Sequence, residues 1–423
     1  MKKLFTLTAL GSIFLASQAV ASGYNLKEQS ASAQANAFAG ATAGAEDISY
    51  SYFNVAGLAR HKGTHFYGGG AWVAPYSKLR KASSGGVAAF NGGATTSSNK
   101  DNIVRPAFAP SFYFSHQLND RWFAGASLNV PFGMVTKYDD DWAGRFHGTL
   151  SKLTVVNFNP MVAYKVKDDM SIGAGLQMQY IKARLRNSVY GGQVGGHHIT
   201  DKATVEGDDF SLGYQLGALY EYSDTLRFGI GYRSKVEHKL GGDIEFDGPM
   251  SALAQSVSAE LTMPAILTLG AYHDINDKWA IMAEITRNYW SAFDELVIEG
   301  KRTGLRSTTD EKWSDTTAYS IGASYKYNDK LKFRFGVALD QKAVGNDYRT
   351  PRIPDSDRIW YAGGIQYKYN DKITYNLAYT YIDAKTAKVY LDGSHSGDAA
   401  RGSLFAEYRN SIHIIGFGIN YNF

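Results

Sequence analysis

The dominant feature of this sequence is a two-residue alternation of apolar with small or polar side chains, which recurs from about residue 63 onward. It is clearest over residues 226–233, 331–340 and 373–381. Successive side chains of a strand point to opposite faces, so each segment would have one continuous apolar face. The other face is rich in glycine and alanine, whereas a soluble sandwich would carry long polar side chains there. We therefore expect a closed barrel with a lipid-facing outer wall and a crowded or hydrated interior.

Short polar turns separate these segments at regular intervals. They are Asn119-Asp120-Arg121, Lys167-Asp168-Asp169, Ser223-Asp224, Asn276-Asp277-Lys278, Asn328-Asp329-Lys330 and Asn370-Asp371-Lys372. Asparagine and aspartate tolerate the backbone conformations of tight hairpins. Consecutive turns lie about 42 to 55 residues apart, which leaves room for two strands and one long loop. The spacing predicts an all-β fold, a transmembrane antiparallel β-barrel of about 14 strands.

The composition excludes several other classes of protein. The chain of 423 residues has no cysteine, so a disulfide framework, a zinc ribbon and a cysteine nucleophile are ruled out. No later window approaches the roughly 18 consecutive apolar residues of a membrane-spanning helix. The formal net charge is +4, and no basic stripe interleaved with aromatic residues predicts nucleic-acid binding.

Both termini have the features of an exported outer-membrane protein. Two lysines precede a mostly apolar run that ends at Leu15, and Ala19-Val20-Ala21 provides a signal-peptidase site. A membrane anchor would need about 20 apolar residues, and this run is nearer to a dozen. At the other end, the final alternating segment ends in Phe423, which is typical of strands recognised by the outer-membrane assembly machinery.

Residues 22–60 break the alternation. Alanine occupies every second position from 31 to 45, and Asn25 and Glu28 have the spacing of a capping box that opens a short helix. Small and polar residues cannot cover a lipid face. The segment could be a disordered tail, but it also suits a compact plug, without which a barrel of this size would contain an aqueous hole. We therefore expect a signal peptide (1–21), an N-terminal hatch (22–60) and a barrel (61–423).

An ordered series of short motifs covers nearly the whole chain after the signal peptide. It comprises Gly23-Tyr24-Asn25-Leu26, Asn54-Val55-Ala56-Gly57-Leu58, Asn129-Val130-Pro131-Phe132-Gly133, Trp142-Ala143-Gly144-Arg145, Leu261-Thr262-Met263-Pro264, Phe333-Arg334-Phe335-Gly336 and Ile353-Pro354-Asp355. The series resembles the FadL family (OmpP1/FadL/TodX type), outer-membrane channels for long-chain fatty acids and other hydrophobic molecules.

The resemblance implies passive uptake without catalysis. A hydrophobic ligand, either a fatty acid or an aromatic hydrocarbon, would bind in a pocket above the hatch and leave sideways through a gap in the barrel wall. The implied partners are this ligand, outer-membrane lipids and lipopolysaccharide, and the assembly machinery that reads Phe423. A monomer is expected, with no cofactor, metal or nucleic acid.

In this family the wall gap comes from a kink in the third strand. Here the third strand begins at Trp122 and runs through Asn129 to Pro131, Phe132 and Gly133. Proline lacks a backbone donor and glycine has no side chain to pack, so strand pairing is expected to fail there. Alternatively, Pro131 simply ends the strand.

The resemblance also implies gating and ligand-binding residues. Asp340 matches a wall aspartate that faces the hatch asparagine, here Asn54, and this pair could latch the hatch. The alternative is a solvated lumen charge. In the hatch tripeptide Asn54-Val55-Ala56, Val55 stands where the family usually has proline, so the turn is expected to be less rigid. Arg184 and Arg186, at the outer end of the fifth strand, are candidates to bind a ligand carboxylate.

Two other functions remain open. A general diffusion porin would have the same strand pattern. An outer-membrane lipase would need a serine and a histidine, and His197 and His198 lie near Ser188 in a glycine-rich loop, but with no fixed spacing.

Overall fold

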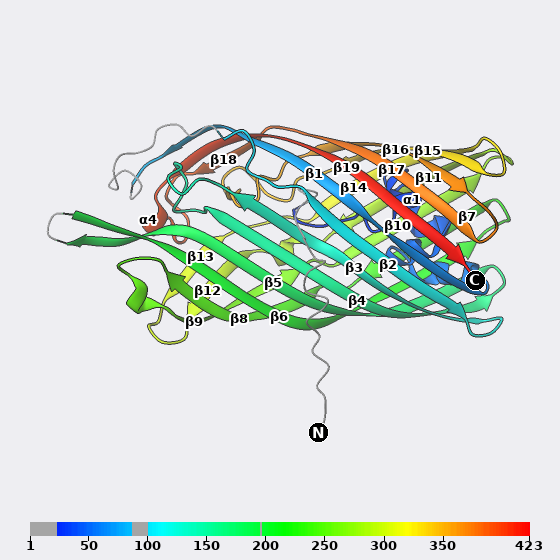
Figure 1. Cartoon of the computed structure of the whole chain (residues 1–423), viewed down its shortest axis with the longest axis horizontal. Coiled ribbons are helices and arrows are strands. Elements are labelled where there is room, and N and C mark those ends of the chain that lie inside the picture. Colours follow the sequence, from blue (N-terminus) through cyan, green and yellow to red (C-terminus); the bar gives the residue numbers. More distant parts are fainter. Residues whose placement is uncertain (1–22, 87–99, 195–196) are drawn as a thin grey trace, which may run out of the picture.

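The computed structural model describes residues 23–86, 100–194 and 197–423, and the expected signal peptide lies outside these residues (Figure 1). Nineteen strand segments form one antiparallel sheet that closes on itself where β19 pairs with β1. The strands are β1 (Thr64–Ser84), β2 (Ala107–Gln117), β3 (Trp122–Lys137), β4 (Leu150–Lys167), β5 (Met170–Val194), β6 (His197–Glu221), β7 (Leu226–Arg233), β8 (Val236–Phe246), β9 (Gln255–Met263), β10 (Ile266–Asp274), β11 (Trp279–Asn288), β12 (Glu295–Gly300), β13 (Arg306–Asp310), β14 (Thr316–Lys326), β15 (Leu331–Asp340), β16 (Arg358–Lys368), β17 (Ile373–Ala384), β18 (Ala387–Leu391) and β19 (Leu404–Asn422).

Five pairs of segments continue one another across a short break, namely β7 with β8, β9 with β10, β11 with β12, β13 with β14, and β17 with β18. The closed barrel therefore has 14 strands, and the predicted fold class and strand number are confirmed. Within the described residues no helix is long and apolar enough to cross a membrane.

All six predicted short turns lie at the same end of the barrel as Phe423, whose backbone nitrogen donates to Thr64 O at 3.0 Å (Figure 1). In four of these turns one asparagine side-chain oxygen accepts two backbone N–H groups at 2.8 to 3.0 Å. These residues are Asn119, Asn276, Asn328 and Asn370. This local cap closes the hairpin without help from distant residues, which explains why the turns could be read from sequence. Short turns mark the periplasmic side of such barrels.

The alternation predicted along each strand is present in the wall. On β19, for example, Ile415, Phe417 and Ile419 are exposed on the outer face. Their neighbours Gly416 and Gly418 lie against lumen side chains. The outer face therefore has the continuous apolar surface that a lipid-facing wall requires.

The hatch fills the lumen near the periplasmic end (Figure 1). It contains four short helical elements, α1 (Ala31–Gln34), α2 (Ala41–Gly44), η2 (Ile48–Tyr52) and η3 (Val55–Arg60). Beyond the hatch are three short pieces, η4 (Ser251–Leu253), η5 (Trp290–Ala292) and α4 (Asp398–Arg401). The predicted helix start at Asn25 is wrong. Ser30 caps α1, its hydroxyl oxygen accepting from Ala33 N at 3.2 Å, and Asn25 forms an isolated bridge with strand β3.

A belt of glycines on the lumen face explains why the hatch fits. These glycines come from nine of the barrel strands, and an added Cβ would come within 3.1 Å of a hatch atom at each. They are Gly125, Gly173, Gly217, Gly229, Gly231, Gly270, Gly322, Gly336, Gly364 and Gly416. We call this set the glycine belt. The small second face noted in the sequence is therefore the seat of the hatch, where wall and hatch backbones touch directly.

Candidate ligand cavity and hatch

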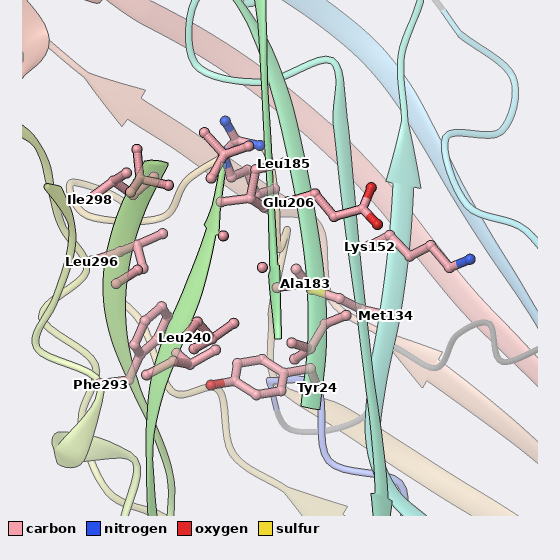
Figure 2. A pocket seen from close by; sticks show the side chains of 18 of the residues that line it. Tyr24, Met134, Lys152, Ala183, Leu185, Glu206, Leu240, Phe293, Leu296 and Ile298 are labelled. Atoms are coloured by element: carbon pink, nitrogen blue, oxygen red, sulfur yellow. The ribbon is translucent and has the colours of Figure 1, made fainter. Parts of the chain in front are cut away.

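An apolar cavity lies between the hatch and the extracellular end of the barrel, and Figure 2 shows side chains that line it. It contains about 780 Å³ of empty space, part of it open to solvent. The lining comes from the hatch, β3 to β6, β8, β9, β12 and three loops. Its apolar members are Tyr24, Met134, Leu153, Ala183, Leu185, Val205, Leu240, Val257, Ala259, Leu261, Phe293, Leu296, Ile298 and Ile353. This arrangement suits a hydrophobic ligand because most of its surface would leave water.

Tyr24 forms one end of the cavity, close to Phe293 and Leu240 (Figure 2). Four aromatic rings surround its ring with centroid distances of 4.8 to 6.1 Å. They belong to Phe132, Trp290, Phe293 and Trp313. Edge-to-face contacts of this kind add to the free energy of burial. The first described residues of the hatch are thus held in an aromatic cluster directly beside the cavity.

Strand β3 changes register at the predicted kink. Asn129 pairs with Asn157 of β4 and Phe132 pairs with Val155, so three steps along β3 span two steps of β4. An extra residue of this kind inverts the alternation of faces. Odd-numbered residues of β3 face the lumen up to Asn129, and Phe132 then points inward to Tyr24. Pro131 does not end the strand, which continues to Lys137.

The same region of β3 loses its pairing with β2. The described pairs between these strands end at Leu128, although β2 continues to Ala107 alongside β1. On the lumen side the hatch takes the free edge instead. Leu26 N donates to Pro131 O at 2.8 Å, and Gly133 N donates to Tyr24 O at 3.0 Å. A three-residue piece of the hatch therefore lies between the cavity and the unpaired part of the wall.

Two ionisable groups in loops line the cavity. The Arg352 guanidinium donates to Leu150 O and to Ser151 Oγ, both at 2.9 Å, and burial lowers its pKa to about 10. Glu311 accepts from the Trp313 ring nitrogen at 3.1 Å, and burial raises the pKa of its carboxyl to about 8. Near pH 7 the cavity therefore has one cation and one neutral carboxyl at its wall.

The candidate carboxylate ligands Arg184 and Arg186 do not reach the cavity. Arg184 is exposed on the outer wall and lies 3.6 Å from Glu206, and Arg186 pairs with Asp247 at 2.9 Å. Even-numbered residues of this part of β5 point outward, so both arginines are on the wrong face. Lys152 and Glu206 also direct their charged groups away from the cavity (Figure 2).

Arg352 is the arginine that lines the cavity, in place of those two. It was missed because it lies in a loop, where no alternation assigns a face. Its position immediately before the motif Ile353-Pro354-Asp355 was the available signal.

The expected latch between Asp340 and Asn54 is absent. Asn54 donates to Thr42 O at 2.8 Å and to Ala218 O at 2.9 Å, so it binds the hatch and β6. Asp340 is on the lumen face but lies 3.3 Å from Arg358, which also donates to Asp355 at 2.7 Å. The predicted pair is wrong because the two residues belong to different sectors of the lumen.

Other residues connect the hatch to the wall. Glu46 pairs with Arg334 and, at 3.2 Å, with Lys332, and both cations belong to β15. The hydroxyl of Thr42 donates to Glu284 of β11. Arg334 could have been noticed from sequence, because it is a long cation among small residues on the lumen face. Its partner Glu46 carries no comparable signal.

Val55 is the first residue of η3, and Asn54 is its N-cap, accepting from Ala56 N at 3.0 Å. Val55 and Ala56 pack against Gly173 of β5. Proline is favoured at the first position of a helix. The turn therefore keeps the conformation that a proline would adopt although valine occupies the position.

A family model matches residues 12–423, and its description is "Outer membrane protein transport protein (OMPP1/FadL/TodX)". Outer membrane protein P1 of Haemophilus influenzae is 28% identical, and the alignment covers 99% of this chain and 98% of that protein. The long-chain fatty acid transport protein of Escherichia coli is 27% identical over 100% of this chain and 99% of its own length.

Among solved structures, a FadL homologue of Pseudomonas aeruginosa has the same fold. The TM-score is 0.85 at 23% sequence identity, and the superposition covers 95% of this chain and 100% of that one.

Proposed function

The chain belongs to the OMPP1/FadL/TodX family of outer membrane transport proteins, and from this premise we propose that it takes up long-chain fatty acids by lateral release through its barrel wall. It is a β-barrel of the outer membrane of a Gram-negative bacterium, in a family of transport channels for hydrophobic compounds and not of enzymes. The specific ligand and its exit route are the proposed steps.

One observation carries the proposal. The hatch segment Tyr24–Leu26 separates the apolar cavity from the part of β3 that has lost β2. A ligand in the cavity would reach the membrane once this segment moved away from Pro131 and Gly133. Each methylene buried in the cavity contributes about 0.8 kcal/mol before entropic costs, so a long acyl chain supplies ample binding energy.

Arg352 favours a fatty acid over a neutral hydrocarbon such as an aromatic. Its guanidinium is charged near pH 7 and lies at the wall of a mostly apolar cavity. A carboxylate at this position would gain a charge-assisted hydrogen bond, whereas a neutral hydrocarbon would gain nothing there.

A reversible cross-link tests lateral release. Asn25 pairs with Phe132, and the two hydrogen bonds that flank this pair leave it as a non-hydrogen-bonded pair. The Cα atoms of such pairs lie about 4.5 Å apart, within disulfide range. Because the chain has no cysteine, the double variant Asn25→Cys/Phe132→Cys can form only this one intramolecular bond.

Cells that lack other fatty acid transporters would express the double variant, and uptake of a radiolabelled fatty acid would be measured. Oxidation is expected to stop uptake and reduction to restore it, while either single variant should not respond to oxidant. Full uptake by the oxidised double variant would refute passage past this segment.

Planar bilayer recordings separate the transporter from a general diffusion porin. The hatch contacts described above predict a low conductance, and a large steady conductance with free sugar permeation would support the porin.

We further propose that residues 1–21 are a signal peptide removed on export, that Phe423 is read by the assembly machinery, and that the barrel works as a monomer. Phe423 is 70% exposed beside Tyr421 at the end of the closing strand, where a receptor could reach it.

A further inference from the structure

A cluster of five cations, four exposed and one half-buried, lies on the outer wall where β1, β18 and β19 meet, away from the short turns. It consists of Lys78, Arg80, Lys81, Lys388 and Arg409, which we call the rim cation cluster. A groove in the wall runs past it and is lined by three of these cations together with Tyr390, Phe405 and Glu407.

A β-bulge places two consecutive cations on the same face. The register between β1 and β19 shifts between Leu79 and Lys81. Leu79 and Ala82 are buried on the lumen side, whereas Arg80 and Lys81 are both exposed. A regular strand would direct one of these two side chains inward, so the bulge concentrates positive charge on the outer wall.

Strand pairing places one pair of like charges directly opposite each other, Lys78 and Arg409. Lys81 and Lys388 both lie opposite Glu407, so these two cations share a single acid. Like charges directly opposite in an antiparallel pair are destabilising. An anion bound beside Lys78 and Arg409 would remove this repulsion.

The cluster has an excess of unpaired cations. Lys78 pairs with Asp101 at 2.9 Å, but within the described residues the side chains of Arg80, Lys81, Lys388 and Arg409 have no ion pair or hydrogen bond. The nearby acids are Asp101, Glu407 and Asp347. Other outer-wall cations do have acidic partners, such as Lys182 with Glu206, Lys239 with Glu260 and Arg306 with Glu299.

The cluster lies at the height of lipid headgroups. His413 contacts Tyr379 and Tyr381 on the outer wall, and we assign these rings to the extracellular aromatic girdle. Arg409 lies four residues from His413, toward the extracellular end of β19. For a strand tilted by about 40°, this corresponds to about 10 Å beyond the girdle. The apolar band below, which includes Trp72 and Ile415, would accommodate acyl chains.

We propose that the rim cation cluster binds the phosphate groups of an outer-leaflet glycolipid, the lipid A part of lipopolysaccharide. Its phosphates would lie between the cations of β1 and those of β18 and β19, and its acyl chains would run down the apolar wall. Basic clusters at a membrane surface attract anionic headgroups in this way. This site is on the outside of the barrel and is independent of the ligand cavity.

Native mass spectrometry of the whole protein in mild detergent tests the proposal. The probe is bisphosphorylated lipid A, and the variant is Lys81→Gln/Lys388→Gln/Arg409→Gln. Each cation contributes about a fivefold factor in affinity, so the triple variant should bind lipid A about a hundredfold more weakly. The matched control is Lys182→Gln/Lys239→Gln/Arg306→Gln, which removes three acid-paired outer-wall cations and should bind like the parent protein.

The three substituted cations are exposed, so the triple variant should fold, and heat-modifiable migration on gels checks that it does. Dephosphorylated lipid A should bind the parent protein as weakly as bisphosphorylated lipid A binds the triple variant. Equal binding by triple variant and parent would overturn the proposal. So would displacement of lipid A by millimolar inorganic phosphate, since the site would then be one for a free anion.

Discussion

Replacing Gly336 by alanine should unseat the hatch. Gly336 belongs to the glycine belt on β15, and an added Cβ would lie 2.1 Å from both the carbonyl carbon and the oxygen of Asn36. Both are backbone atoms and cannot rotate away. An ordinary contact needs about 3.4 Å, so the hatch backbone must move by about 1.3 Å.

The cost can be estimated from the contacts that this movement breaks. Asn36 donates from its side chain to Ala323 O at 2.9 Å and to Phe335 O at 3.0 Å. Each of these hydrogen bonds contributes about 1 kcal/mol, and overpacking adds about 1 to 3 kcal/mol. The seated hatch should lose about 3 to 5 kcal/mol, which raises the unseated population roughly a hundredfold to several thousandfold.

The neighbouring strand offers a matched control. Gly363 of β16 is adjacent to Ala362, which pairs with Gly336. An added Cβ at Gly363 would meet only Arg334 O, at 3.7 Å. Two measurements apply to both variants, namely single-channel conductance in planar bilayers and hydrogen exchange of hatch peptides. Gly336→Ala should show frequent openings and faster hatch exchange, and Gly363→Ala should behave as the parent protein. If both variants match the parent in both assays, direct contact between wall and hatch backbones does not seat the hatch.

Three further variants probe the hatch and the cavity. Val55→Pro should stabilise the hatch by about 0.4 to 1 kcal/mol, because Asn54 (φ −149°, ψ 107°) already has the extended backbone conformation that a residue before proline prefers. Slower hydrogen exchange of the hatch would support this, and faster exchange would contradict it. The Glu311 carboxyl, whose pKa burial raises to about 8 from 4.5, stabilises the fold fully below pH 4.5 and loses this contribution as the pH rises to about 8. The ionised carboxylate would put a charge at the wall of the cavity, so binding of a neutral fluorescent hydrocarbon, measured by titration, should weaken as the pH rises through 8. A pH dependence that persists in Glu311→Gln would exclude this carboxyl as its source. Arg352→Met should weaken fatty acid binding about tenfold or more and leave hydrocarbon binding unchanged in the same titration, whereas equal losses for both ligands would argue against carboxylate recognition.

The sequence alone was sufficient for the architecture of the barrel. Side-chain alternation and asparagine turns are properties of neighbouring residues, and the caps at Asn119 and Asn370 close their hairpins locally. Alternation also assigns a face to each residue of a regular strand. Along β5 this alternation places Arg184 on the outer face, outside the lumen.

The seat of the hatch was decided only by tertiary structure. Asn54 meets β6 instead of Asp340, and Glu46 meets Arg334 across 288 residues of sequence. Neither contact has a local signal, because the hatch has no strand period that relates its residues to the wall. Its position follows from where backbone can approach backbone, and the glycine belt defines that position only once fourteen strands have closed around it.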